Sequence, residues 1–187
     1  MKSEKVKVKN EKIMVEIVLT RTFGNRQFTL GRLEEPKTGF KCKTMERIDP
    51  KHWKGMKNFC AIPEGSYKIR ICTHPDLSFY LQLVLAGAYR NAAIGGPATP
   101  FGLPAGSIAV GTEYAKELHM LKGSDIVCQG INKWVNALFT DGHIKSFSHS
   151  GEIMLKVQYS DYYTYKDDVL VVEEKEVKRD ENFDFLQ

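Results

Sequence analysis

The sequence lacks the features that define several large classes of protein. Its 187 residues contain no apolar run close to the roughly 20 residues that span a membrane, so no transmembrane helix is expected. The first residues, MKSEKVKVKNEK, are charged and are followed by no apolar segment, which argues against a signal peptide. We expect a soluble chain with one domain, because its length suits a single hydrophobic core.

Cysteine and histidine are too scattered to indicate a metal site or a disulfide framework. The four cysteines, Cys42, Cys60, Cys72 and Cys128, form no CxxC pair and are expected to be free thiols. The five histidines show no HxH or HExxH spacing. Phosphate-binding loops of the GxGxxG or GK(S/T) type are also absent. We therefore expect neither a metal nor another cofactor.

The net charge of +4 is modest, and much of it lies at the start of the chain. Residues 1–12 contain five lysines and two glutamates and form a basic N-terminal arm. Such an arm can touch nucleic acid or an acidic partner. We favour a solvated arm, and nucleic acid is not an expected partner, because no arginine cluster or interleaved aromatic residues accompany the lysines.

Alternating apolar and polar residues dominate the middle of the chain and predict β-strands. Val15, Ile17 and Leu19 share one face, and the same period recurs in residues 28–30, 67–71, 79–85 and 153–159. Turn signals such as FGNR and EEPKTG separate these runs. The expected fold is mainly β, a β-rich α+β class, with half-buried antiparallel strands in a sheet or a compact barrel.

One segment has a clear helical period. Ser124 is a candidate N-cap and Gly142 a candidate stop, and between them lie apolar residues at helical spacing, namely Val127, Ile131, Trp134, Val135 and Leu138. This amphipathic helix should pack on the sheet. A second, shorter helix is expected from Thr112 to Gly123.

Composition divides the chain into the arm at 1–12, a β-rich domain at 13–160 and a C-terminal extension at 161–187. The extension opens with tyrosines, becomes rich in mixed charges, and ends with apolar residues that alternate with acids. We expect partner-binding anchors there, and the candidates are Tyr162, Tyr163, Tyr165, Phe183, Phe185 and Leu186. For the tyrosines, packing along an edge strand is the open alternative.

Several short motifs follow one another in a recognisable order. TLGRLEEP and FKCKTMER come first, CAIPEGSYKI follows, and a Gly-rich loop closes on GSIAVG. This order resembles a family of unknown function that is frequent in phages and prophages, with the motifs LGxL, TLE(D/R), AIPxGxY, IHxGN and GCIxVG. The resemblance covers roughly residues 15 to 140. It implies a small β-rich domain whose Cys and His face each other as in L,D-transpeptidases, which act on peptidoglycan through a cysteine nucleophile.

The chain departs from this pattern where the chemistry would occur. Ile94 matches the Ile of IHxGN, but Gly95 stands in place of the His and Ser107 in place of the Cys. An adjacent imidazole readily generates a thiolate, whereas a serine hydroxyl needs a positioned base. The sequence offers no histidine between His74 and His119. We predict that this loop, comprising Ile94, Gly95, Gly96, Gly106 and Ser107, is a degenerate site.

These observations favour a non-catalytic structural or accessory protein of the phage virion. Such a protein would be present in several copies and would bind neighbouring virion proteins through its tails and surface loops. The alternative is an enzyme that acts on peptidoglycan with Ser107 as nucleophile and a base that the sequence does not identify. A nucleic-acid-binding accessory protein that uses the N-terminal lysines is a weaker third hypothesis.

Overall fold

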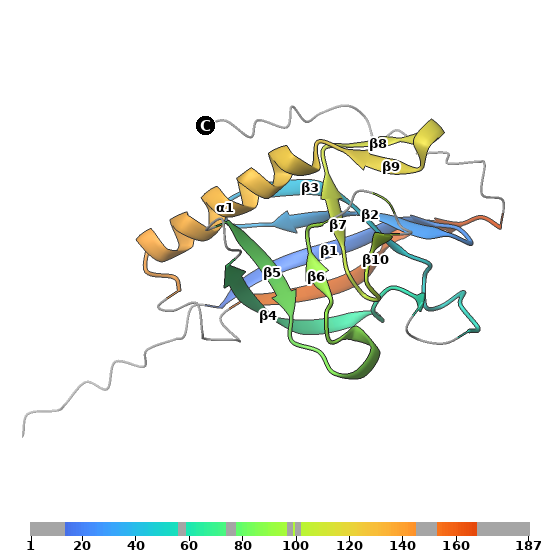
Figure 1. Cartoon of the computed structure of the whole chain (residues 1–187), viewed down its shortest axis with the longest axis horizontal. Coiled ribbons are helices and arrows are strands. Elements are labelled where there is room, and N and C mark those ends of the chain that lie inside the picture. The colour runs from blue at the N-terminus through green and yellow to red at the C-terminus, as the bar shows by residue number, and fades with distance from the viewer. Residues whose placement is uncertain are drawn as a thin grey trace, which may run out of the picture.

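The computed structural model describes residues 14–55, 59–73, 78–96, 99, 102–144 and 153–167 (Figure 1). The expected arm at 1–12 and the candidate anchors Phe183, Phe185 and Leu186 lie outside the described residues. Every fold statement below refers to the described ranges.

The described chain is rich in strands and contains one α-helix. The strands are β1 (Val15–Gly24), β2 (Phe28–Glu35), β3 (Phe40–Arg47), β4 (Gly65–Thr73), β5 (Phe79–Leu83), β6 (Ala93–Ile94), β7 (Ala109–Gly111), β8 (Glu113–Ala115), β9 (Met120–Lys122) and β10 (Ile153–Tyr165). The helix is α1 (Ser124–Thr140), and two short 3-10 turns are η2 (Gly87–Tyr89) and η4 (Lys116–Leu118). The expected mainly β class with one amphipathic helix is confirmed.

Eight strands form one sheet that curls into a nearly closed barrel. Their order is β6-β5-β4-β10-β1-β2-β3-β7, and β8 pairs with β9 in a separate hairpin. A single parallel bridge between Ile94 and Ile108 joins the β6 edge to the chain entering β7. The expectation of a sheet or a compact barrel is therefore confirmed in its barrel form.

One expectation about strand direction is wrong. β1 and β10 pair in parallel, although most other neighbours in the sheet are antiparallel as expected. A parallel pair needs a long connection, and the chain between these two strands builds the rest of the barrel. β10 also continues to Tyr165, so the expected domain boundary after residue 160 falls inside this strand.

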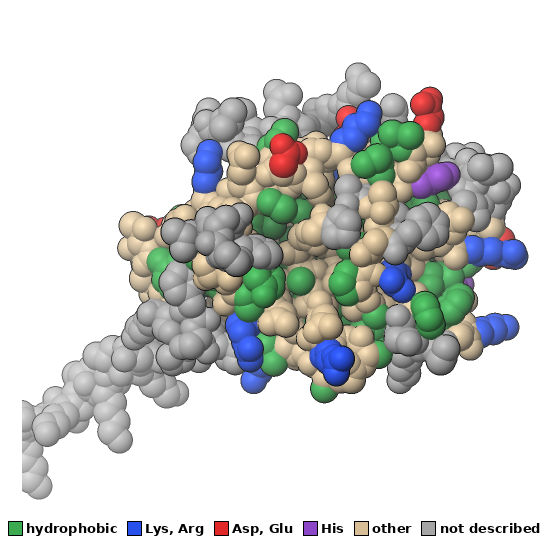
Figure 2. All heavy atoms as spheres, viewed as in Figure 1, with side chains coloured by type: hydrophobic (Ala, Val, Ile, Leu, Met, Phe, Trp, Pro, Cys, Tyr) green, Lys and Arg blue, Asp and Glu red, His purple; other side chains and the backbone are tan. Residues whose placement is uncertain are grey.

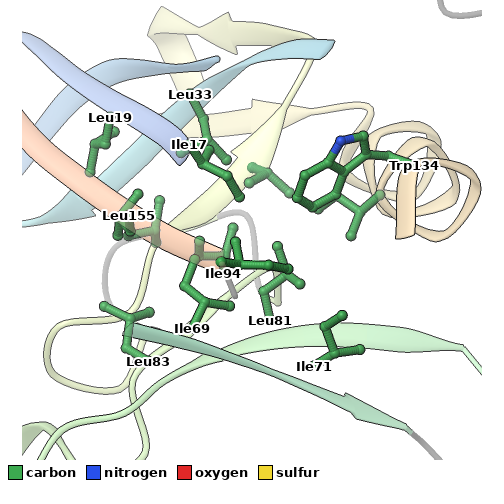
Figure 3. Packing of buried hydrophobic residues seen from close by; sticks show 14 of the residues in the cluster. Ile17, Leu19, Leu33, Ile69, Ile71, Leu81, Leu83, Ile94, Trp134 and Leu155 are labelled. Carbon is green, nitrogen blue, oxygen red and sulfur yellow. The ribbon is translucent and has the colours of Figure 1, made fainter. Parts of the chain in front are cut away.

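The barrel interior is filled by the inward-facing residues of the alternating strands. Figure 3 shows Ile17 and Leu19 of β1 lying opposite Ile69 of β4 and Leu81 of β5, all of them buried. Period-two alternation places these side chains on one side of each strand. The apolar pattern read from the sequence is thus the wall of one continuous core.

A second, smaller core lies on the outside of the sheet. Phe28 and Leu30 of β2 and Met45 of β3 belong to it, and the β8–β9 hairpin covers them with Tyr114 and Leu121. The rings of Phe28 and Tyr114 are 5.7 Å apart between centroids. Burial of these outward apolar residues requires a covering element, and the hairpin supplies it.

That covering role explains why residues 112–123 do not form the expected second helix. The segment instead forms β8, η4 and β9, with His119 in a left-handed conformation at φ 47°. Its helical amphipathicity is weak, and packing onto an exposed apolar patch overrides a weak local preference. The expected helix is wrong for this reason.

The helix α1 is confirmed, with a correction at its start. Gly123 is the N-cap at φ 66°, and Ser124 is the first helical residue, whose Oγ donates a hydrogen bond to the carbonyl of Val110. Its buried side chains are those expected, namely Val127, Ile131, Trp134, Val135 and Leu138. α1 contacts β3, β5 and β7, and Figure 1 shows it lying between β3 and β5. It therefore packs beside the line where the barrel closes.

Truncation in the interior should destabilise the protein far more than truncation on the surface. Leu81 is 1% exposed and Val84 is 40% exposed on the same stretch of chain. We expect Leu81→Ala to lower the free energy of unfolding by about 2–5 kcal/mol and Val84→Ala to change it by less than about 0.5 kcal/mol. Urea denaturation followed by circular dichroism measures both, and equal effects would contradict the packing described here.

Candidate functional site

The Gly-rich loop singled out in the sequence forms the line of barrel closure, which we call the seam. The N–H of Ile108 donates to the carbonyl of Ala93 at 2.8 Å, and the N–H of Gly95 donates to the carbonyl of Ile108 at 2.9 Å. These two bonds belong to the parallel bridge between Ile94 and Ile108. Of the expected loop residues, Ile94, Gly95 and Ser107 are thus brought together by backbone pairing.

Ser107 is buried in the seam. Ser107 is 2% exposed, and its Oγ accepts a hydrogen bond from the N–H of Ala93 at 3.1 Å. Its own N–H donates to the carbonyl of Pro104 at 3.0 Å. The hydroxyl therefore adds a third hydrogen bond to the closure, and a substrate could reach it only if the seam opened.

Gly95 and Gly96 have backbone conformations that side chains rarely adopt. Their φ angles are +115° and +95°, outside the ordinary regions for L-residues. A Cβ at Gly95 would lie 3.9 Å from the Sγ of Cys128 on α1. Burial raises the pKa of the Cys128 thiol, against the opposing effect of a backbone hydrogen bond from Gly96. Because residues with a side chain rarely adopt a φ of +115°, a histidine at position 95 would require a different loop conformation.

Gly106 allows a close approach on the other side of Ser107. A Cβ built there would meet Ile62 Cγ2 and Tyr89 Cδ1, both at 2.7 Å. The N–H of Gly106 donates to the carbonyl of Cys60 at 3.2 Å, and the hydroxyl of Tyr89 lies 3.2 Å from the Cys60 Sγ. Burial is the main cause that raises the pKa of Tyr89. The loop is thus packed tightly against the CAIP segment.

A comparison of Gly106 with Gly39 separates the effect of crowding on stability from the effect of backbone strain, because both have nearly the same φ angle. Gly106 has φ +73° and Gly39 has φ +74°, but nothing lies within 4 Å of a Cβ at Gly39. We expect Gly39→Ala to cost about 1–2 kcal/mol from the left-handed backbone. We expect Gly106→Ala to cost about 1–3 kcal/mol more, because the methyl group overpacks the seam. Urea denaturation of both variants tests this, and equal costs would show that the seam is not crowded.

The described histidines do not serve Ser107. His119 pairs through Nδ1 with the hydroxyl of Tyr114 at 3.0 Å, and His52 stacks on Tyr165 with ring centroids 3.6 Å apart. Across the described ranges no histidine hydrogen bonds to Ser107, whose side-chain partner is the backbone of Ala93. His74 and His149 lie outside these ranges.

A buried ion pair that the sequence reading missed lies at one end of the barrel. Arg21 is 0% exposed and binds Glu46 through two hydrogen bonds, Nε to Oε2 at 2.8 Å and Nη2 to Oε1 at 2.7 Å. Nη2 also donates to the carbonyl of Ile62 at 2.6 Å, and Nη1 donates to the hydroxyl of Tyr159 at 3.1 Å. The pair links β1, β3, β10 and the IPEG turn.

Asp49 extends this network to the C-terminal half of β10. It is 0% exposed and accepts the hydroxyl of Tyr159 at 2.7 Å through Oδ1 and the hydroxyl of Tyr163 through Oδ2. The N–H of Lys51 donates to the same carboxylate at 2.8 Å, and the Lys51 ammonium lies 3.4 Å from the centre of the Tyr159 ring. The network therefore holds β10 where the sheet pairs it on one side only.

Charge and burial act in opposite directions in this network. Burial lowers the pKa of Arg21, but the Glu46 carboxylate beside it outweighs burial and leaves that pKa raised. Burial is the main cause that raises the pKa values of Tyr159 and Tyr163. Hydrogen bonding to Asp49 raises them further, and the Arg21 charge opposes both effects. Arg21 is thus kept charged and both tyrosines are kept as neutral donors. In the sequence, Arg21 occupies the next inward position of β1 after Val15, Ile17 and Leu19. This charge among inward apolar residues is the signal that the sequence reading missed.

Removing one member of the ion pair should be worse than removing both. Arg21→Met leaves the Glu46 carboxylate buried without its partner, and we expect a loss of about 3–5 kcal/mol. Arg21→Met combined with Glu46→Leu removes both charges, so we expect it to be more stable than the single variant. Chemical denaturation of Arg21→Met, Glu46→Leu and the double variant tests this. A double variant that costs the sum of both single changes would mean that the residues act independently.

The three tyrosines expected as partner-binding anchors lie in different environments. Tyr162 is 41% exposed and its hydroxyl accepts a hydrogen bond from Arg32 at 3.2 Å. Tyr163 is engaged with Asp49, and Tyr165 with His52. Among these three, Tyr162 offers the most accessible surface.

Other site types find no support within the described ranges. No group of three or more His, Cys, Asp or Glu side chains there is arranged to hold a metal ion. No helix in the same part of the chain combines the length and hydropathy of a membrane span. None of Cys42, Cys60, Cys72 and Cys128, all of them in the described ranges, forms a disulfide. No family model, curated protein or solved structure matches this chain.

Proposed function

We propose that this chain is a non-catalytic structural or accessory protein of a phage particle, where it binds neighbouring proteins through its terminal segments and surface loops. The proposal starts from the ordered motifs TLGRLEEP, FKCKTMER, CAIPEGSYKI and GSIAVG, which resemble those of a phage-associated family. It adds that several copies assemble in the particle.

One observation carries the non-catalytic part of the proposal. The residue in place of the expected nucleophile, Ser107, is buried and its Oγ accepts a backbone hydrogen bond within the seam. A serine nucleophile needs a base within hydrogen-bonding reach and an open path for the substrate. Gly95, in place of the expected histidine, carries no side chain and has a φ of +115°. Both positions support barrel closure rather than catalysis.

The surface supports a role in binding. Tyr162 is an exposed aromatic residue on β10, the strand that leads directly into the charged C-terminal extension. Tyrosine at a surface is well suited to interfaces, because its ring is apolar and its hydroxyl forms hydrogen bonds. On either side of it, Tyr159 and Tyr163 are held by hydrogen bonds to the buried Asp49. An assembly protein needs such a fixed platform for its contacts.

The test compares two variants in particles produced in the host. Deletion of residues 168–187 leaves β10 intact, and we expect it to abolish incorporation because the candidate anchors Phe183, Phe185 and Leu186 are lost. Ser107→Ala leaves the Ala93 N–H without its acceptor and should lower the free energy of unfolding by about 1–3 kcal/mol. We expect its incorporation to be unchanged. Quantitative mass spectrometry of purified particles measures both.

The enzyme hypothesis gives opposite results in the same experiments. If Ser107 were a nucleophile, the purified chain would release fragments from isolated peptidoglycan and Ser107→Ala would stop that release. Normal incorporation of the truncated chain, shown by thermal unfolding to be folded, would count against the binding role of the C-terminal extension. Each result separates assembly from catalysis.

A further inference from the structure

The outward face of the barrel carries an excess of positive charge between β4 and β3. Strand register places six cations on this face, and we call it the cationic face: Lys68 and Arg70 of β4, Lys156 of β10, Arg32 of β2, and Lys41 and Lys43 of β3. The acidic residues that the same register places among them are Glu16 of β1 and Glu34 of β2. The face therefore has a local net charge of +4, from six positive and two negative side chains.

The β4–β10 side of this face carries three cations without neutralising partners. Lys68, Arg70 and Lys156 are exposed, and within the described ranges none of them forms an ion pair or a side-chain hydrogen bond. Lys68 lies opposite Met154 in the sheet, so Lys156 is its diagonal neighbour. Diagonal neighbours lie about 7–8 Å apart, and residues two apart on a strand lie about 7 Å apart.

Three like charges at these separations repel one another. The spacing from Lys68 to each of the other two cations is at or below the Debye length of about 8 Å at physiological ionic strength, so salt screens this repulsion only in part. Arg70 lies four residues from Ser66, the residue opposite Lys156, so Arg70 and Lys156 are largely screened from each other. An anionic partner would remove the repulsion and add attraction. By contrast, Arg32 already lies 4.0 Å from Glu34 and donates to Tyr162. The unsatisfied charge is thus concentrated on β4 and β10.

The space-filling view shows only the β4 edge of this face, because β5, β6 and β7 lie nearer the viewer than β10 and β1 (Figure 1). In Figure 2, Lys and Arg side chains lie along the lower edge of the molecule, where Figure 1 places β4. Asp and Glu side chains visible in this view lie in its upper half and at its sides. The barrel surface is convex here, which suits a partner segment lying across the strands rather than a small ligand that needs a pocket.

The neighbours of these cations favour a polypeptide over a nucleic acid. Partly buried apolar side chains, Met154 and Val18, lie between the charges, and the carboxylate of Glu16 lies next to Met154 across the sheet. Single-stranded nucleic acids are usually held by aromatic residues that stack on the bases. The outward residues around Lys68, Arg70 and Lys156 include no aromatic ring, and the exposed Tyr162 lies at Arg32 instead. Mixed apolar and cationic surface is typical of protein contacts.

We propose that the cationic face is a docking surface for an acidic polypeptide segment of a neighbouring protein in the particle. This inference rests on the proposed function and specifies the chemistry of the partner. Lys68, Arg70 and Lys156 form its β4–β10 side, and Arg32, Lys41 and Lys43 lie beyond β1 on the side of β3.

Binding of a labelled decaglutamate peptide to the full chain tests this inference. We expect binding by fluorescence anisotropy at low ionic strength, weakening as salt is added. The triple variant Lys68→Glu, Arg70→Glu, Lys156→Glu should bind at least about tenfold more weakly, because repulsion replaces attraction at these three positions. The matched control is Lys54→Glu, Lys116→Glu, Lys133→Glu, which makes the same change in charge at exposed residues elsewhere. The control should retain most of the binding.

Several outcomes would overturn the inference. They are the absence of peptide binding, equal losses in both triple variants, and tighter binding of a ten-nucleotide oligothymidylate than of the peptide at the same salt concentration. The particle assay separates this inference from the proposed function. If the triple variant is incorporated normally while the chain truncated after Asp167 is excluded, the docking surface is wrong and the assembly role stands. If the truncated chain is incorporated normally, the proposed use of the C-terminal extension fails, whatever the peptide result.

Discussion

Closure of the barrel rests on a small set of backbone hydrogen bonds between the chain around Ile94 and the chain around Ile108. An open sheet leaves a row of unpaired N–H and C=O groups at each edge, and closure removes both edges at once. β6 and β7 contain only two and three residues, so they cover little of this seam. α1 packs beside it and contacts β5 and β7. The Gly-rich loop, the helix and the barrel therefore form one structural unit.

The end of the barrel where Arg21 meets Glu46 depends on buried charged side chains rather than on backbone pairing. A buried ion pair adds little net stability, since desolvation offsets much of the attraction, but breaking it is costly. Its value here is geometric. Arg21 fixes the IPEG turn through the Ile62 carbonyl, and Asp49 fixes β10 through two tyrosine hydroxyls. Beyond Val157, β10 no longer pairs with β4. The hydrogen bonds from Tyr159 and Tyr163 to Asp49 hold this part of β10 instead.

The sequence predicts local structure well where one interaction dominates. Alternation located β1, β4 and β10, and helical spacing located α1, because in each case burial on one face decides the conformation. The parallel pairing of β1 with β10 could not be read from the sequence, since alternation does not encode the direction of a neighbour. Residues 112–123 were misread because their conformation depends on Phe28 and Leu30, which are distant in sequence. Arg21 was missed because a charge on an inward face has meaning only once Glu46 is known to lie opposite.

The serine at position 107 and the glycine at position 95 serve the same structural purpose. Position 107 must offer an acceptor to the N–H of Ala93, and a hydroxyl oxygen accepts far better than a thiol sulfur, which is a weak acceptor. Position 95 must adopt a φ of +115° while its N–H bonds to Ile108, and glycine does so without the steric cost that histidine would meet. A serine and a glycine therefore strengthen the same bridge at its two sides. A thiol at position 107 and an imidazole at position 95 would weaken that bridge at both positions, so closure of this barrel and Cys/His chemistry at its seam would make opposing demands on the same two residues.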